Sequence, residues 1–225
     1  MPKQSTPKSV PGRDQEQTVE DYLKGLITQG LLAPGQRVTE AEVIKDTGAS
    51  RSRVRQAFQR LAVEGIMTIE EFRGASVKRL GKMEIIQLYE VREVLEGLAA
   101  RGAATNASAK SKNNLMRLQS KMDSSEKSGD WATFVQLNQQ WHQEITDACE
   151  NSIVKELMNR LNVPINRLLS QVYPKLDEIA LVNKDHKEIT EAILGGSEET
   201  AEKLMRRHIR AGFMLRRVRS LPDAK

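Results

Sequence analysis

The sequence predicts a mainly helical protein in which a winged helix-turn-helix precedes an all-helical six-helix bundle. Aromatic residues make up only 4% of the 225 residues, while Leu, Ala, Glu, Lys and Arg are common, which favours helices over sheets. Short helical and strand-like segments alternate up to residue 80, and only long amphipathic patterns follow. We therefore divide the chain into a flexible tail (1–15), a small mixed domain (16–80) and a helical domain (81–220).

The charge balance and the single cysteine narrow the class of protein. The formal net charge of +5 permits a nucleic-acid partner without requiring one. Cys149 is the only cysteine, which excludes an internal disulfide and fits a reducing cytoplasm. The first residues are rich in Pro, Ser and Lys and lack an apolar core, so we expect a tail and not a signal peptide. No apolar run is long enough to span a membrane, and we expect a cytoplasmic protein without a membrane partner.

The order of elements in the small mixed domain is that of a winged helix-turn-helix. Apolar residues recur at helical spacing over residues 19–27. Thr39 and Glu42 form a capping box, which starts a short helix that Gly48 ends. A third helix begins near Ser50, and two strand-like pieces joined by a turn follow it. The predicted elements are a helix over residues 17–30, a helix over 40–46, a helix from about residue 50 to 62, and strands over 66–69 and 75–79.

Long amphipathic helices without a strand signal follow residue 81. Breaks at Asn106-Ala107-Ser108, Ser128-Gly129-Asp130 and Gly195-Gly196 separate some of them. Cations near the C-terminus of the last helix are favoured by the helix dipole, so we expect its arginines to form a solvent-exposed basic end. The six predicted helices cover residues 82–104, 109–127, 131–149, 152–171, 174–194 and 197–218.

The third helix of the mixed domain presents a row of arginines. Arg51, Arg53 and Arg55 lie at its start, and no acidic residue interrupts the segment. Guanidinium groups there suit guanine edges in the major groove, while serine hydroxyls and the helix N-terminus suit phosphate. The alternative is a solvated basic face. The preceding capped helix and the hairpin tip at Arg73 and Gly74, which can reach a neighbouring groove, favour DNA.

Three histidines, the only ones in the chain, can converge inside the helical domain. Asn138 and His142 are four residues apart and share one face of a helix. His186 and His208 flank the break at Gly195-Gly196, and in an antiparallel pair they stand about 14 Å and about 18 Å from that turn. All four side chains can then meet at one height as ligands of a metal ion. The alternative is that separate histidines pair with backbone or solvent.

Several segments of the chain resemble the GntR superfamily of transcriptional regulators. The resemblance to the DNA-binding domain of the superfamily lies in residues 30–38 (GLLAPGQRV) and residues 48–65 (GASRSRVRQAFQRLAVEG). Residues 88–100 (LYEVREVLEGLAA) resemble the opening helix of the effector domain, the FCD domain, in the FadR branch of the superfamily. Six helices in the effector domain suggest the VanR-like subgroup.

The resemblance implies roles for individual residues of the winged helix-turn-helix. Arg51 and Arg55 match the base-reading arginines. Ser50 and Ser52 match phosphate contacts, and Gly74 matches the glycine at the wing tip. The positions that depart from the family pattern are Arg53 and Ala41.

The resemblance also implies a metal site. Metal-binding members of the branch use an Asp-x-x-x-His pair and two later histidines, and the matching positions are Asn138, His142, His186 and His208. An amide replaces the carboxylate at Asn138, which removes negative charge near the ion. Three imidazoles still suffice for zinc or nickel, with water or an effector oxygen at the open positions. The alternative is a metal-free pocket in which the histidines hydrogen-bond an anionic effector.

Arg92 is the candidate for binding the effector. We expect its helix to bury Val91, Leu95 and Leu98, so that the guanidinium can point into the bundle and clamp a carboxylate. The alternative is a salt bridge to Glu96, four residues on. In the family an arginine of this helix often meets the effector, which favours the effector role.

These observations predict a dimeric, ligand-responsive bacterial transcription factor and not an enzyme. Its partners would be an operator with inverted half-sites and a small effector, expected to be a carboxylate. The alternative function is a metal-dependent hydrolase, because three histidines with an open position also describe catalytic zinc. Glu188 is only two residues from His186 and projects off its face, and no His-Glu-x-x-His pattern exists, which disfavours the hydrolase.

Overall fold

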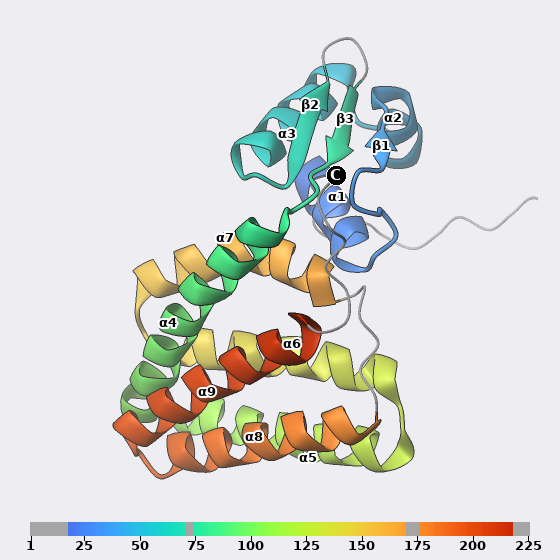
Figure 1. Cartoon of the computed structure of the whole chain (residues 1–225). Coiled ribbons are helices and arrows are strands. Elements are labelled where there is room, and N and C mark those ends of the chain that lie inside the picture. The colour runs from blue at the N-terminus through green and yellow to red at the C-terminus, as the bar shows by residue number, and fades with distance from the viewer. Residues whose placement is uncertain (1–17, 71–73, 170–175, 218–225) are drawn as a thin grey trace, which may run out of the picture.

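The computed structural model describes residues 18–70, 74–169 and 176–217, and these residues form two parts with separate hydrophobic cores (Figure 1). The first part is mixed and the second is all-helical, as predicted. In Figure 1 the mixed part sits at one end of the bundle, where α1 packs against α7. The predicted tail, residues 1–15, lies outside the described residues.

The mixed part is a winged helix-turn-helix with a three-stranded antiparallel sheet. The strand order is β1-β3-β2, with Val38 opposite Ala75 and Ile69 opposite Ala75 on the other side. The first strand was not predicted, because two residues are too few to show an alternating pattern. Its elements are α1 (Val19–Thr28), β1 (Arg37–Val38), α2 (Glu40–Thr47), α3 (Arg51–Val63), β2 (Met67–Glu70) and β3 (Gly74–Val77).

Local chemistry sets the boundaries of α2. The Thr39 hydroxyl accepts a hydrogen bond from the Glu42 N–H at 3.3 Å, and the Glu42 carboxylate accepts one from the Thr39 N–H at 2.8 Å. This reciprocal pair is the predicted capping box. Gly48 ends the helix in the left-handed conformation, with φ of 70°, which suits a residue without a Cβ.

The bundle contains the six predicted helices, with boundaries that differ by a few residues at most where both ends are described. The predicted junction between residues 171 and 174 falls on residues 170–175, which are outside the described residues. The helices are α4 (Lys82–Asn106), α5 (Ala109–Ser128), α6 (Trp131–Ala148), α7 (Ser152–Leu169), α8 (Leu176–Leu194) and α9 (Glu198–Arg217).

A tight turn makes α8 and α9 an antiparallel hairpin. Gly196 has φ of 70°, and the Ser197 N–H donates to the Ala192 carbonyl at 2.9 Å. Helix α9 also packs along α4, and α5 packs against α6 and α8 (Figure 1). Trp141 of α6 is fully buried in the core of the bundle. No helix in the described part of the chain is long and apolar enough to cross a membrane.

Helix α4 has an apolar face that points out of the bundle, and one expectation about it was wrong. Val91 and Leu98, which we expected to be buried, are 50% and 41% exposed, and Val94 between them is exposed as well. Helical periodicity identifies an apolar stripe but not the surface that covers it. The inward face of α4 instead carries Tyr89, Arg92, Glu96, Ala99 and Ala103.

Candidate DNA-reading helix and histidine cluster

The start of α3 presents the predicted DNA-binding residues to solvent. Ser50 is the N-cap, and its hydroxyl oxygen accepts a hydrogen bond from the Arg53 N–H at 3.4 Å. The side chains of Arg51, Ser52, Arg53 and Arg55 are exposed. The opposite face of the helix buries Val54, Ala57, Phe58 and Leu61 in the core of the mixed part.

Glu40, the first residue of α2, was not anticipated as a partner of this arginine row. Its carboxylate lies 2.7 Å from Nε of Arg55 and 3.5 Å from Nε of Arg51. The two arginine side chains remain 63% and 71% exposed. Ion pairs at such exposed positions contribute little stability, so the guanidinium groups can exchange Glu40 for a base or a phosphate at low cost.

Of the two predicted wing-tip residues, Gly74 is described and Arg73 lies outside the described residues. Gly74 opens β3 with φ of 92°. A Cβ at this position would stand 2.8 Å from the carbonyl oxygen of Val38 on the neighbouring strand. Both the backbone conformation and the close approach of β1 therefore require glycine here.

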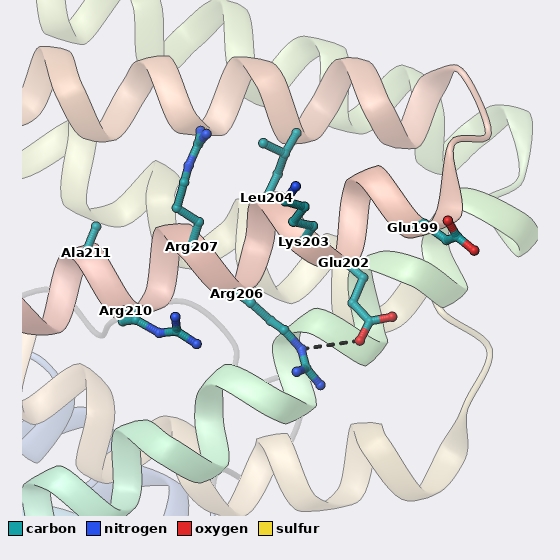
Figure 2. Close-up of a pocket in the computed structure, with 8 residues that line it drawn as sticks. All are labelled: Glu199, Glu202, Lys203, Leu204, Arg206, Arg207, Arg210 and Ala211. Carbon is teal, nitrogen blue, oxygen red and sulfur yellow. Dashed lines mark ion pairs between the residues drawn. The ribbon is translucent and has the colours of Figure 1, made fainter.

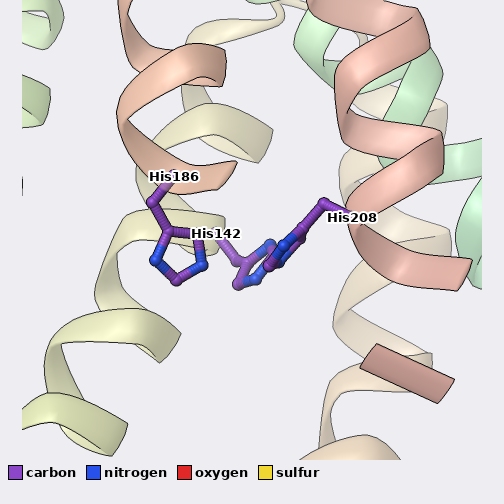
Figure 3. A group of neighbouring side chains, drawn as sticks. All are labelled: His142, His186 and His208. Carbon is purple, nitrogen blue, oxygen red and sulfur yellow. The ribbon is translucent and has the colours of Figure 1, made fainter. Parts of the chain in front are cut away.

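The three histidines come together inside the bundle from three different helices (Figure 3). His142 comes from α6, His186 from α8 and His208 from α9. One nitrogen from each ring lies within 4.8 Å of the other two, a spacing at which three imidazoles can share one ion. His186 and His208 were expected within one helical turn of the same height on either side of the α8–α9 turn, and their ring centroids lie 4.7 Å apart.

His186 is the member of the cluster with the clearest need for a partner. Its side chain is fully buried, and neither ring nitrogen has a hydrogen-bond partner among the described residues. A buried nitrogen without a partner costs about 1–3 kcal/mol. Burial lowers the pKa of His186 well below its ordinary value, and the neighbouring His208 and His142 lower it further. The ring is therefore neutral, which is the form that binds metals.

Carboxylates contact the other two histidines at Nδ1. Oε2 of Glu96 contacts Nδ1 of His142, and Oδ2 of Asp185 lies 3.5 Å from Nδ1 of His208. Burial lowers the pKa of His142 to about 4 even though Glu96 opposes the shift. A neutral ring that donates from Nδ1 to a carboxylate keeps its Nε2 lone pair for another ligand. The donor set therefore fits a divalent metal ion that prefers nitrogen ligands.

Arg92 and Glu96 form a buried ion pair beside the cluster. Their side chains are 6% and 4% exposed, and Nε of Arg92 contacts Oε1 of Glu96. Burial alone would raise the pKa of Glu96, but the charges and hydrogen bonds of Arg92 and His142 lower it to about 2. The guanidinium thus lies inside the bundle, as expected for an effector ligand, and also makes the salt bridge that was the alternative. The sequence signal for Glu96 was only its i,i+4 spacing from Arg92.

Asn138 and Trp141 are the remaining residues of α6 near the cluster. Asn138 is half-buried and lies one helical turn before His142, and its role as a ligand stays a prediction. Trp141 is a core residue, and its indole N–H donates to the Thr190 hydroxyl at 2.9 Å. The indole ring lies 4.5 Å from the imidazole of His186, centroid to centroid, and forms one wall around it.

The basic side chains of α9 line a separate pocket on the outer surface of the bundle, which contains none of the histidines (Figure 2). Of the arginines expected to form the basic end, the described side chains of Arg206, Arg207 and Arg210 are partly neutralised by carboxylates. Arg207 contacts Asp185 at 2.9 Å and Glu188 at 2.6 Å, and Arg210 contacts Glu93 at 2.6 Å. Arg206 contacts Glu202 at 3.2 Å. The full lining is Glu199, Glu202, Lys203, Leu204, Arg206, Arg207, Arg210 and Ala211.

Two known domain families cover both parts of the chain. Residues 15–77 match the family described as bacterial regulatory proteins, gntR family, and residues 87–211 match the FCD domain. The chain is 28% identical over 195 residues to the "Probable D-xylose utilization operon transcriptional repressor" of Paenarthrobacter nicotinovorans, covering 86% of this chain and 84% of that protein. It is 23% identical over 208 residues to the regulator LutR of Bacillus subtilis, covering 82% and 93%.

Solved structures share the fold over nearly the whole chain. Escherichia coli McbR/YncC superposes with a TM-score of 0.80 at 20% identity, covering 90% of this chain and 97% of that one. A GntR transcriptional regulator from Rhodococcus sp. RHA1 gives a TM-score of 0.75 at 21% identity, covering 91% and 98%. The VanR-like assignment within this fold stays a prediction.

These matches decide between the two functional classes that the sequence left open. The family and the relatives named above are transcriptional regulators. These matches therefore do not support the alternative function as a hydrolase. The histidine cluster therefore belongs to a DNA-binding, ligand-responsive regulator and not to an enzyme. The FCD match covers more than half of the chain and follows the gntR-family match at residues 15–77. Together the two matches show that the protein belongs to the gntR family of bacterial regulatory proteins, in the FadR branch that carries an FCD effector domain.

Proposed function

We propose that the protein is a homodimeric regulator that senses a small carboxylate in a metal-containing pocket of its helical domain. The observation that carries this proposal is the histidine cluster, in which three ring nitrogens lie within 4.8 Å of one another and both nitrogens of His186 are buried without a partner. His142, His186 and His208 would hold zinc or nickel, and Asn138 would add a neutral oxygen ligand. The ion would bind an oxygen of the effector as a Lewis acid.

Arg92 supports a carboxylate as the effector. A planar guanidinium can bind both oxygens of a carboxylate, and in a buried setting such charge-assisted hydrogen bonds are strong. Arg92 is only 5% exposed and lies beside the histidine cluster, so one small anion can reach both the arginine and the ion. A neutral molecule would offer neither the guanidinium nor the ion a negative charge to bind.

The α3 helix would read the operator in the bacterial cytoplasm, where the chromosome lies. Arg51, Arg53 and Arg55 would enter the major groove, where arginine recognises guanine. Ser50 and Ser52 would contact phosphates beside the helix N-terminus. The wing residues Arg73 and Gly74 would approach the adjacent backbone or groove.

A homodimer supports the recognition of inverted half-sites, because a two-fold protein matches a two-fold operator. Helix α4 leaves Val91, Val94 and Leu98 exposed, and the neighbouring α7 leaves Ile153 and Leu157 exposed. Exposed apolar side chains on two helices that pack together support an association surface there. We propose that this α4–α7 surface contacts the same surface of a second copy.

Operator binding under defined metal and effector conditions tests the proposed function. The untagged chain would be treated with a chelator, reloaded with zinc or nickel, and titrated with DNA from upstream of its own gene in the presence of a panel of small carboxylates. We expect at least one carboxylate to change the DNA affinity of the metal-loaded protein. Arg92→Lys keeps the charge but removes the planar fork, and should weaken that response.

The matched control is Arg101→Lys, which changes an exposed arginine of the same helix. It should respond to the carboxylate as the unmodified chain does. A response that is equal in metal-loaded and metal-free protein would favour the metal-free pocket. DNA binding that no carboxylate alters, with or without metal, would contradict the proposed function.

A further inference from the structure

The carboxylate of Glu96 joins two groups that the proposed function uses separately. Its Oε1 contacts Nε of Arg92, one turn earlier on α4, and its Oε2 contacts Nδ1 of His142 on α6. The three side chains are 4%, 6% and 11% exposed, respectively. One buried carboxylate therefore spans the proposed effector ligand and a proposed metal ligand.

Because Glu96 is buried, its interaction with either Arg92 or His142 depends on how it interacts with the other. Water screens charges poorly in the interior, so the charge of Glu96 acts strongly on both neighbours. If Arg92 pairs with another anion, it neutralises less of the Glu96 charge. The carboxylate then attracts the His142 ring more strongly. Outer carboxylates of this kind orient metal-binding histidines and raise their basicity.

The other histidines have different surroundings. His186 has no hydrogen-bond partner among the described residues. His208 contacts Asp185, but that carboxylate also pairs with Arg207, whose side chain is 54% exposed. Solvent screens an exposed guanidinium, so the Asp185 pair is less sensitive to a bound anion than the Glu96 pair.

We propose that Glu96 is a positioning residue that couples anion binding at Arg92 to metal binding at His142. An anion that shares the Arg92 guanidinium weakens its hold on Glu96, and the carboxylate then acts more strongly on His142 and its ion. Glu96 thereby supplies, from outside the ligand set, the negative charge that Asn138 does not. By linkage, the anion strengthens metal binding by the same factor as the metal strengthens anion binding.

This inference rests on the proposed metal site, and it is tested with cobalt(II) alone as the probe. Cobalt(II) affinity and its visible absorption bands would be measured for the chelator-treated chain and for Arg92→Lys, Glu96→Gln and the double variant. Glu96→Gln should weaken cobalt(II) binding by about 10- to 100-fold and shift the absorption bands, because the His142 ring loses its carboxylate. Arg92→Lys should change the affinity in the unmodified background and have no effect in the Glu96→Gln background.

The control is Glu93→Gln, which removes a carboxylate of the same helix that pairs with Arg210 on the outside. It should leave the cobalt(II) affinity and spectrum unchanged. If Glu96→Gln fails to fold, Arg92→Gln with Glu96→Gln replaces the ion pair by two neutral amides and should show the same loss of affinity.

Different results would overturn the metal site and the coupling through Glu96. Absence of cobalt(II) binding by the unmodified chain would overturn the metal site and the coupling together. Binding that is equally tight and spectrally identical in Glu96→Gln would overturn the coupling and leave the metal site standing. Equal effects of Arg92→Lys in both backgrounds would show that Arg92 acts without Glu96, which also contradicts the inference.

Discussion

Nε of Arg55 on α3 lies 2.7 Å from Oε1 of Glu40 at the start of α2. The ion pair joins the two helices of the helix-turn-helix and holds the arginine over the N-terminal end of α3. Because the Arg55 side chain is 63% exposed, the pair orients the guanidinium without removing it from solvent. We propose that this orientation prepares the arginine for the operator before DNA is bound.

Replacing Arg55 with Ala should weaken operator binding by about 1–3 kcal/mol for each guanine that the arginine recognises, which is the range for a bidentate arginine on that base. Fluorescence anisotropy at several salt concentrations would measure it. Arg117→Ala, which removes an exposed arginine of α5, is the control and should bind as the unmodified chain does. An unchanged operator affinity in Arg55→Ala would contradict the proposed placement of α3 in the major groove.

Gly74→Ala should destabilise the winged helix-turn-helix more than Gly48→Ala. Both glycines have positive φ, but a Cβ at Gly74 would stand 2.8 Å from the Val38 carbonyl oxygen, while nothing lies within 4 Å of one at Gly48. We expect about 1 kcal/mol for Gly48→Ala from the backbone conformation alone. Gly74→Ala should cost at least about 2 kcal/mol.

Hydrogen exchange of peptides from residues 18–77 would measure both glycine variants in the full chain. Faster exchange in Gly74→Ala than in Gly48→Ala is the expected order. Equal exchange in the two variants would show that the hairpin adjusts to the added carbon, so that close packing of β1 on Gly74 is not what demands glycine.

Asp123 should stabilise the α5–α8 contact in a pH-dependent way. Burial alone would raise the pKa of its carboxyl, but hydrogen bonds from Gln119 and Asn183 and the ammonium of Lys187 lower it below its ordinary value. A lowered folded-state pKa means that the stabilising charge is present above the unfolded value of about 3.9. This contribution disappears as the pH falls through the folded value.

Urea denaturation of Asp123→Asn at pH values from 6 down to 3 tests the direction of this pH dependence. At pH 6 the variant should have a lower free energy of unfolding than the unmodified chain. This difference between the two proteins should shrink as the pH falls towards 3. Asp147→Asn, at an exposed carboxylate on α6 that pairs with Lys155, is the control. A gap that stays constant down to pH 3 would mean that the Asp123 charge plays no part.

The helices and the winged helix-turn-helix could be predicted because their signals are local. The Thr39 and Glu42 capping box, Gly48 and the 3.6-residue apolar period each act within one or two turns of chain. The convergence of His186 and His208 followed from counting residues on both sides of one turn. The strand β1 was missed because it has only two residues and exists through its pairing with β3.

The ion pairs that link different helices at the two sites could not be predicted. Glu96 reaches His142 across the α4–α6 interface, and Glu40 reaches Arg55 across the turn between α2 and α3. Which face of an amphipathic helix is covered also depends on its neighbours, so Val91 and Leu98 were expected inside when they face outward. The sequence offered candidate residues for the site, and the packing of the helices decided their partners.

The metal site is tested most directly by titrating zinc into the chelator-treated, untagged chain, beside His186→Leu. The unmodified chain should bind about one zinc per chain and gain about 2.7 kcal/mol of stability at a free zinc concentration 100-fold above Kd. His186→Leu removes two buried nitrogens without partners, so without metal it should be at least as stable as the unmodified chain, and zinc should not stabilise it. No zinc binding by the unmodified chain, or equal binding by His186→Leu, would contradict a metal held by His142, His186 and His208.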